Sequence, residues 1–300
     1  MPRPFCNRPC RVALAASLCA AALAGCRSLD RAPVSQSVVE GRQLTQQGVN
    51  AMDRGDWRRA ESLLERAVST NSKDVDARRN YAETLWQRGA KTDALAQLES
   101  ARKLDDCDPA LAVRTGEIYL ALGQTNSAGE MVEVALRADP KFAQAWALRG
   151  SVAAAGGKQH EALADYQRAL GYAPDSYDFA LLVAETYRTL NEPEQALVAL
   201  ETLAERYPPG EAPQQVLHLQ GLTLASLARH DDAARMLAAA AQRERPNSEL
   251  LYHLARAEFA SGRPQHAHYA LQQALAQDPA HAPSQALAAQ LTAANTAVRR

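Results

Sequence analysis

Small apolar residues recur along this chain at a fixed period. Seven alanines follow one another at intervals of 34 residues, with a single interval of 37. A unit of this length cannot bury its own apolar face, so the pattern predicts helical hairpins that stack on their neighbours. The function is then expected on a surface. The marker alanines are Ala60, Ala94, Ala128, Ala162, Ala196, Ala233 and Ala267.

Two further positions keep the register of these alanines. A Gly or Ala always stands twelve residues earlier, and a larger apolar residue stands four residues later on the same helical face. The pattern predicts close contact between the two helices of each hairpin. The small residues are Gly48, Ala82, Gly116, Gly150, Ala184, Gly221 and Ala255. The larger ones are Leu64, Leu98, Val132, Tyr166, Leu200, Leu237 and Leu271.

Turn residues separate the predicted helices. Five positions before the marker, residues that tolerate a left-handed backbone favour a tight helix end. They are Gly55, Gly89, Gly123, Gly157, Asn191 and Gly262, whereas Ala228 breaks this rule in the sixth unit. Proline stops a helix because it lacks the amide donor, which predicts the ends of four second helices at Pro140, Pro174, Pro208 and Pro279.

These residues together resemble the tetratricopeptide repeat, whose pattern of about 34 residues runs Trp, Leu-Gly, Tyr, Ala, Phe, Ala and Pro. The fourth unit departs from it at Arg149, where Leu is usual, and at Ala153, where Tyr is usual. The resemblance implies an all-α, right-handed superhelical solenoid of about seven hairpins plus a C-terminal capping helix. The matching residues of the fourth unit are Trp146, Gly150, Ala162, Tyr166, Ala169 and Pro174.

The same register divides the chain into units. We expect seven repeats over residues 41–281, preceded by a flexible tether at 26–40 and followed by the capping helix at 282–300. The expected repeats are 41–74, 75–108, 109–142, 143–176, 177–210, 214–247 and 248–281.

The first 25 residues carry a different signal. Three arginines precede an apolar run at 12–24 that is shorter than the roughly 20 residues needed to span a bilayer, which predicts an export signal. The run ends in Leu23-Ala24-Gly25-Cys26, which resembles the bacterial lipoprotein signal. That resemblance implies cleavage before Cys26 and its acylation. The alternative is a plain secretory signal that is cleaved nearby, with Cys26 as a bystander.

Arg27 follows this cysteine, where an aspartate would resemble a lipoprotein retained at the inner membrane. In a Gram-negative cell the resemblance therefore implies the periplasmic face of the outer membrane. Cys107 is the one thiol left after the signal and Cys26, so no internal disulfide is expected. Acidic residues flank it and argue against a reactive thiol.

Candidate chemistry is absent from the motifs of the chain. His266 and His268 are two residues apart and point in different directions on a helix, and the seven histidines are scattered. Gly157 and Lys158 belong to a hairpin turn, because neither the second glycine nor the Ser or Thr of a phosphate loop is present. The charge is balanced, with 33 basic and 34 acidic side chains. We expect no enzyme, cofactor, metal, nucleic acid or small-molecule substrate.

The resemblance implies that partners contact the first helix of each unit. Transferring the family's groove positions to this chain gives a set of candidate contacts. The groove is expected to carry small side chains in its middle and larger side chains toward its ends. Trp86, Tyr252 and Phe259 are aromatic anchors in this set, with packing between helices as the alternative. The candidates are Arg79, Glu83, Trp86, Glu117, Gln144, Ser151, Glu185, Arg188, His218, Leu222, Tyr252, Arg256 and Phe259.

The family's clamp for a terminal carboxylate uses Lys and Asn, and this chain has Arg79 with Glu83 instead. An extended peptide of mixed charge or an amphipathic helix is therefore the expected ligand. The leading hypothesis is a lipid-anchored scaffold that binds envelope proteins. The alternatives are an accessory or assembly factor for a pilus or secretion pore, and a regulator of an envelope hydrolase or polysaccharide export system.

Overall fold

Helices make up the whole described part of the protein. The structure, a computed structural model, describes residues 35–298, and within them it contains fifteen helices and no strand. The expected signal peptide at 1–25, the expected acylation site Cys26 and most of the expected tether lie outside the described residues. The predicted all-α fold of stacked helical hairpins is confirmed for the part that is described.

The described chain divides into two compact units, one ending at Pro140 and the other beginning at Lys141. Unit 1 contains α1 (Gln36–Asp53), α2 (Trp57–Thr70), α3 (Val75–Gln87), α4 (Lys91–Arg102), α5 (Pro109–Ala121) and α6 (Thr125–Ala138). Unit 2 contains α7 (Ala143–Ala155), α8 (Gln159–Tyr172), α9 (Tyr177–Thr189), α10 (Pro193–Ala204), α11 (Gln214–Ser226), α12 (His230–Arg243), α13 (Ser248–Ala260), α14 (Pro264–Gln277) and α15 (Ala282–Val298).

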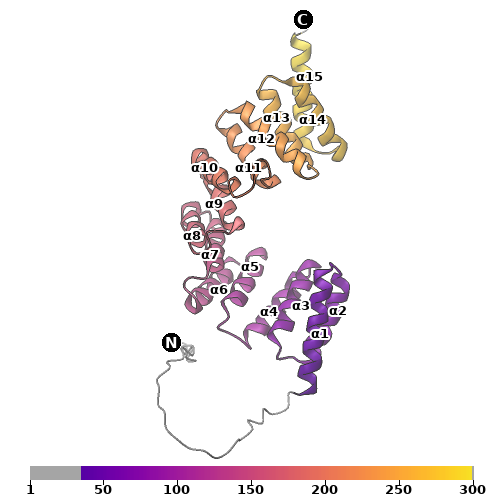
Figure 1. Ribbon diagram of the computed structural model, residues 1–300, viewed down its shortest axis with the longest axis vertical. Helices are drawn as coiled ribbons and strands as arrows, with labels where there is room; N and C mark the ends of the chain where they lie inside the picture. The colour runs from indigo at the N-terminus through magenta and orange to yellow at the C-terminus, as the bar shows by residue number, and fades with distance from the viewer. Residues whose placement is uncertain (1–34, 299–300) are drawn as a thin grey trace, which may run out of the picture. The chain divides into compact units, whose positions relative to one another are not determined.

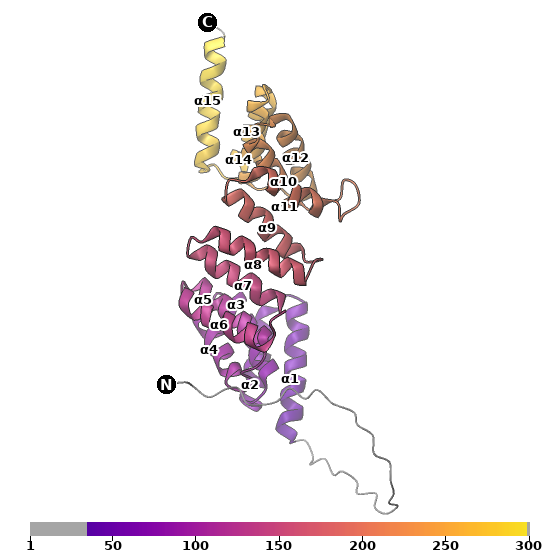
Figure 2. The same cartoon turned by 90° about the vertical axis from the view of Figure 1, so that its left-hand side faces the viewer.

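Within each unit the helices follow chain order (Figures 1 and 2). The two helices of a hairpin pack together, as α1 and α2 do, and the second helix then packs on the first helix of the next hairpin, as α2 does on α3. Odd-numbered helices from α1 to α13 are thus the first helices of seven hairpins in the described chain, and the even-numbered helices are the second.

Each hairpin closes around the small residues that the sequence repeats. All seven marker alanines are fully buried. On the facing helix, a Cβ atom added to Gly221 would lie 2.5 Å from Cγ of Leu237 and 3.2 Å from the carbonyl oxygen of Ala233. A Cβ added to Gly48 would meet Leu64 at the same 2.5 Å. Close packing at these points leaves no room for a larger residue unless the facing leucine side chain or the helices shift.

The turns inside the hairpins share one backbone conformation. The glycines that the sequence predicts there have positive φ angles, for example +72° at Gly55 and +75° at Gly262. Asn191 has a φ of +60° and Ala228 a φ of +56°, so the sixth hairpin keeps the same turn without the favoured residue types. Because alanine is disfavoured in this region, the turn at Ala228 is held against a local backbone cost.

The start of α1 corrects the expected tether. The flexible spacer expected at 26–40 includes residues 36–40, but α1 begins at Gln36. The carbonyl oxygen of Ser35 accepts hydrogen bonds from the backbone amides of Val38 and Val39. No proline or glycine stands between 36 and 40, so nothing in the local sequence stops the helix before the first repeat.

The last helix covers the apolar side of the seventh hairpin. Leu287 and Leu291 of α15 are buried in a cluster that also contains Leu271 of α14 and Ala255 of α13. The apolar face of the final hairpin is therefore covered in the way that a stacked repeat requires.

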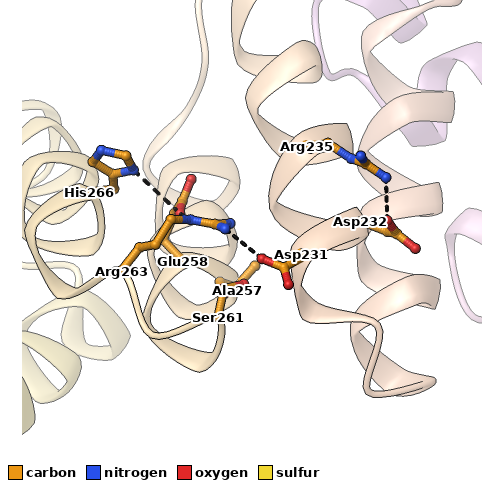
Figure 3. Close-up of polar contacts among 8 residues, drawn as sticks. All are labelled: Asp231, Asp232, Arg235, Ala257, Glu258, Ser261, Arg263 and His266. Atoms are coloured by element: carbon orange, nitrogen blue, oxygen red, sulfur yellow. Dashed lines mark hydrogen bonds and ion pairs between the residues drawn. The ribbon is translucent and has the colours of Figure 1, made fainter.

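Ion pairs reinforce the contact between the sixth and seventh hairpins (Figure 3). The Arg263 guanidinium lies 2.5 Å from Oδ1 of Asp231 at the start of α12, and its Nε donates to Glu258 of α13. His266 of α14 lies 3.7 Å from the same Glu258 carboxylate. These groups are near the surface, so we assign them a minor share of the stability.

The strain at Ala228 leads to a testable prediction. Replacing Ala228 by Gly should raise the free energy of unfolding by about 1 kcal/mol, since glycine adopts a positive φ without steric cost. The control is the same change at Ala164, an exposed residue inside α8, which should lower it by about 1 kcal/mol. Urea denaturation of the variants measures both. Equal losses in the two variants would contradict a strained turn.

Candidate functional site

The candidate contacts lie on the first helices of six hairpins. In unit 1 they come from α3 and α5, and in unit 2 from α7, α9, α11 and α13. The repeat places them there because each first helix turns its small residues toward its partner helix and leaves another face free.

In unit 1 an arginine joins two of the candidates. Arg114 of α5 donates from Nη2 to Glu83 of α3 at 2.6 Å and from Nη1 to Glu117 at 2.8 Å. Burial lowers the pKa of Arg114, but the hydrogen bonds and charges of the two glutamates outweigh it and leave the pKa raised. Sequence reasoning missed Arg114, because it stands one place outside the groove positions that were transferred.

Arg79 lies at a polar hollow of about 710 Å³ in unit 1. The hollow is lined by α1, by the loop before α3 and by the start of α3, including Arg42, Lys73 and Asn80. The Arg79 guanidinium is held 2.6 Å from Asp76 one turn earlier. The lining of this hollow contains hydrogen-bond donors and acceptors, and Arg42 and Lys73 add two positive charges to that of Arg79.

Trp86 both packs and faces cations. Its ring is half-buried against the core cluster of α3, α4 and α5. Lys91 Nζ and the Arg114 guanidinium carbon each lie 5.3 Å from the ring centroid. Contacts of this length are cation–π interactions, so part of the ring surface is already used within the protein.

In the first hairpin of unit 2 the two candidates differ. Gln144 is exposed on α7. The Ser151 hydroxyl is already engaged, since it hydrogen-bonds the Ala147 carbonyl oxygen at 3.1 Å and lies 3.1 Å from the Tyr166 hydroxyl. Of the two side chains, Gln144 is therefore the more available for contact with a partner protein.

The structure also explains the departure from the family pattern at Arg149. Its Nε donates to Oδ2 of Asp165 at 2.8 Å, and its Nη2 lies 2.5 Å from Oδ1 of the same carboxylate. The guanidinium also stacks on Trp146, with 4.0 Å to the ring centroid. Asp165 is 7% exposed, and the bidentate arginine compensates the burial of its charge.

Candidates on α9 and α11 occupy neighbouring places. Glu185, Arg188, His218 and Leu222 are all half-buried. Leu222 packs against the core cluster of α9, α10 and α11, so packing accounts for this side chain. Burial lowers the pKa of Arg188, against the opposing effect of Glu185. Burial also lowers the pKa of His218, and the positive charge of Arg188 adds to this.

Two histidines contact one carboxylate in unit 2, and a third lies beside them. Glu249 of α13 contacts Nε2 of His253 at 2.9 Å and Nε2 of His281 at 3.0 Å. Nδ1 of His281 lies 2.8 Å from the hydroxyl of the buried Ser284 in α15. The rings of His218 and His253 are 5.4 Å apart. The interpretation of the histidines as scattered is therefore wrong for these three: α11 and α13 bring His218 and His253 together, and the loop between α14 and α15 adds His281.

Burial dominates the titration of His253. It lowers the pKa of His253 to about 4, although Glu249 opposes the shift, and the charges of His218 and Arg256 add to it. For Glu249 burial acts to raise the pKa, but its hydrogen bonds and attraction to His281 and His253 leave it lowered. At neutral pH the cluster therefore contains a neutral His253 beside an ionised Glu249.

Tyr252 and Phe259 pack against the cluster that α15 covers, and both are partly buried. The Tyr252 ring also lies 5.9 Å from the ring of His281. Much of the surface of these two rings is thus used in packing within the protein. Arg256, on the same helix, is exposed.

Among residues 35–298 no three His, Cys, Asp or Glu side chains come together as a metal site. None of the helices in that range has the length and apolar character that a membrane crossing requires.

Comparison with protein families agrees with this geometry. One model described as tetratricopeptide repeat matches residues 45–110 and 218–282, and a second with the same description matches 88–152 and 153–217. Together they account for the chain from 45 to 282 without a gap. The chain belongs to the tetratricopeptide repeat family. Members of this family are scaffolds for protein–protein interaction and are in general not catalytic.

Individual relatives are distant. Tetratricopeptide repeat protein 37 of Xenopus laevis is 29% identical over 153 residues, which is 48% of this chain and 10% of that protein. The chain thus spans about a tenth of this relative's length.

Solved structures share the fold at low identity. A tetratricopeptide repeat protein from Parabacteroides merdae has a TM-score of 0.64 and 16% identity, over 86% of this chain and all of that one. YrrB, described as a tetratricopeptide repeat protein with an unusual peptide-binding site, has a TM-score of 0.51 and 18% identity, over 63% of this chain and 96% of that one.

The histidine cluster predicts a loss of stability in acid. His253 is neutral in the folded protein down to about pH 4, whereas its ordinary pKa is 6.5. The unfolded chain therefore binds a proton first as the pH falls, and the stability present above about pH 6.5 is lost down to about pH 4. We expect this residue to account for roughly 1–3 kcal/mol of that loss.

Urea unfolding at a series of pH values measures it, with His253→Gln as the variant. The variant should lose less stability than the parent over this pH range. His230→Gln, on α12 outside the cluster, is the control and should follow the parent. A variant curve parallel to the parent curve would show that His253 does not carry the effect.

Proposed function

We propose that this protein is a lipid-anchored, non-catalytic scaffold of the bacterial cell envelope that binds segments of partner proteins along its first helices. The observation that carries the proposal is the character of the first-helix faces. Their small residues are buried by packing inside the hairpins, whereas charged and polar side chains such as Gln144, Arg256 and Glu117 remain exposed. A repeated face of this kind suits an extended partner.

The candidate contacts divide into two groups under this proposal. Leu222, Ser151, Tyr252 and Phe259 are largely engaged in packing or hydrogen bonds and would shape the binding surface. The polar and charged candidates, with Trp86, would contact the partner directly. YrrB is described as having a peptide-binding site, and a peptide ligand for the present chain is part of the same proposal.

The envelope location is proposed from the N-terminal sequence. A basic start, a short apolar run and the Leu-Ala-Gly-Cys ending at Cys26 support cleavage and acylation of that cysteine. Two or more acyl chains suffice for stable attachment where one is marginal. With Arg27 after the cysteine, the proposed site is the periplasmic face of an outer membrane.

Site-specific photo-crosslinking in intact cells tests the binding face. A photoreactive residue at Gln144 or Arg256 should crosslink a partner protein, because both positions are exposed on first helices. Matched positions on second helices are Val198 and Tyr269, which are 63% and 65% exposed. They should give no such product. Equal crosslinking from both sets would contradict binding along the first helices, and so would its absence from all four positions.

Replacing Cys26 by Ser tests the anchor. Without the thiol no diacylglyceryl group can be added, so the variant should lose its lipid label and either leave the membrane fraction or remain uncleaved. Metabolic labelling with a fatty acid and membrane fractionation measure this. Cys107→Ser is the control and should leave labelling unchanged. A Cys26 variant that is still processed and membrane-bound would rule out lipidation as the means of attachment.

A further inference from the structure

An apolar hollow of about 390 Å³ lies between the second helices α12 and α14 of unit 2. Ala238 and Ala241 of α12 and Ala270 of α14 line it with methyl groups. Leu251 and Leu254 of α13 complete its apolar part. None of the candidate contacts on the first helices lines it. An open apolar surface of this kind is typical of a contact with another protein surface.

The hollow arises where the sixth hairpin departs from the repeat. Five positions after the marker alanine every other hairpin has Glu or Gln, for example Glu201 and Gln272, whereas the sixth has Ala238. Three positions further on, Ala241 stands where the seventh hairpin has Leu275. Two long side chains are thus replaced by methyl groups one turn apart on α12, and the space beside them is left open.

Tyr269 of α14 stands beside the hollow without filling it. Its side chain lines the hollow, yet the residue is 65% exposed. Other hairpins have small or polar residues at this position of the repeat, for example Ser62, Ala96 and Arg235. A tyrosine gives a large contact area for few rotatable bonds and is enriched at protein interfaces. One face therefore presents a projecting ring and a hollow side by side.

The charge of this face favours one occupant. Between Pro264 and Gln277, α14 contains no Asp, Glu, Lys or Arg, whereas each of the other second helices in the described chain has at least two. Among the residues that line the hollow, the charged one is Glu258, whose carboxylate accepts a hydrogen bond from Nε of Arg263 (Figure 3). A twofold contact places a face against its own copy, so charges near the axis meet their like. An uncharged face avoids that repulsion, and a charged partner would find no opposite charge on it.

We propose that a second copy of this chain covers the hollow, with Tyr269 of each copy inserted in the hollow of the other about a twofold axis. A projection and a hollow on one face are self-complementary, as an isologous contact requires. The ring packs on Ala238 and Ala241 of the other copy, and Gln242 and Gln273, which also line the hollow, provide hydrogen-bond partners for its hydroxyl. The contact goes beyond the proposed function, because it uses second helices and leaves the first-helix candidates free.

Sedimentation equilibrium of the full-length chain measures this contact, in detergent with enough micelles that two chains rarely share one. The parent should form dimers. Tyr269→Ala should weaken the dimer about a hundredfold or more, since a twofold contact loses both rings at once. Ala238→Gln should weaken it as well, because it fills the hollow with a side chain that other hairpins carry there. Val198→Ala, at the equivalent exposed position of α10, is the control and should leave the dimer unchanged.

Mixing the two defective variants tests the insertion itself. In a mixed dimer the Tyr269 ring of the Ala238→Gln copy meets an intact hollow in the Tyr269→Ala copy, so one of the two contacts returns. The mixture should therefore contain more dimer than either variant alone. Circular dichroism of each variant separates a lost contact from a lost fold.

Three results would overturn the proposal. A parent that stays monomeric would exclude the second copy and leave the hollow to a segment of another protein. A dimer that is insensitive to both substitutions, or equally weakened by Val198→Ala, would place the contact elsewhere. A mixture with no more dimer than its components would exclude the insertion. These results leave the proposed scaffold untouched, and a crosslink at Tyr269 to a second copy differs from one to a partner by its mass of twice the chain.

Discussion

The structure depends on one close contact, which is repeated in every hairpin. A Gly or Ala on the first helix faces a larger apolar residue on the second, and at Gly221 and Leu237 the helices are too near for even a Cβ atom. Such proximity lets two short helices bury most of their shared face with small side chains. Helices of 12–14 residues that would be marginal alone become stable by stacking on the next pair.

This close packing of small side chains determines where the charged side chains lie. Alanine and leucine fill the hairpins, with the Arg149–Asp165 pair as a charged exception inside one of them. Other charged groups lie on the outer faces or at the contacts between successive first helices. There they bind one another where charges match, as Arg114 does with Glu83 and Glu117. At Arg188 burial prevails over the charge of Glu185 and lowers the pKa of the guanidinium.

Tertiary packing can impose the repeat where the local sequence does not favour it. Ala228 takes the positive φ that glycine or asparagine takes in the equivalent turns, because the helices on both sides are already held by packing. Arg149 replaces the usual leucine and remains compatible with the fold, because Asp165 lies opposite and binds it with two hydrogen bonds. The opposite case is residues 36–40, where nothing stops the helix and α1 begins early.

The sequence alone determined the repeat, the helical class, the turns and the residues that close each hairpin. These follow from spacing along one chain, and a helix converts spacing into a face. It did not determine which first-helix side chains bind each other, because residues such as Glu83 and Arg114 are 31 positions apart and meet only through stacking. For the same reason the tertiary structure decided that His253 and His281 contact Glu249 and that His218 lies beside His253. Small offsets between stacked helices, which no periodic pattern records, select the partners.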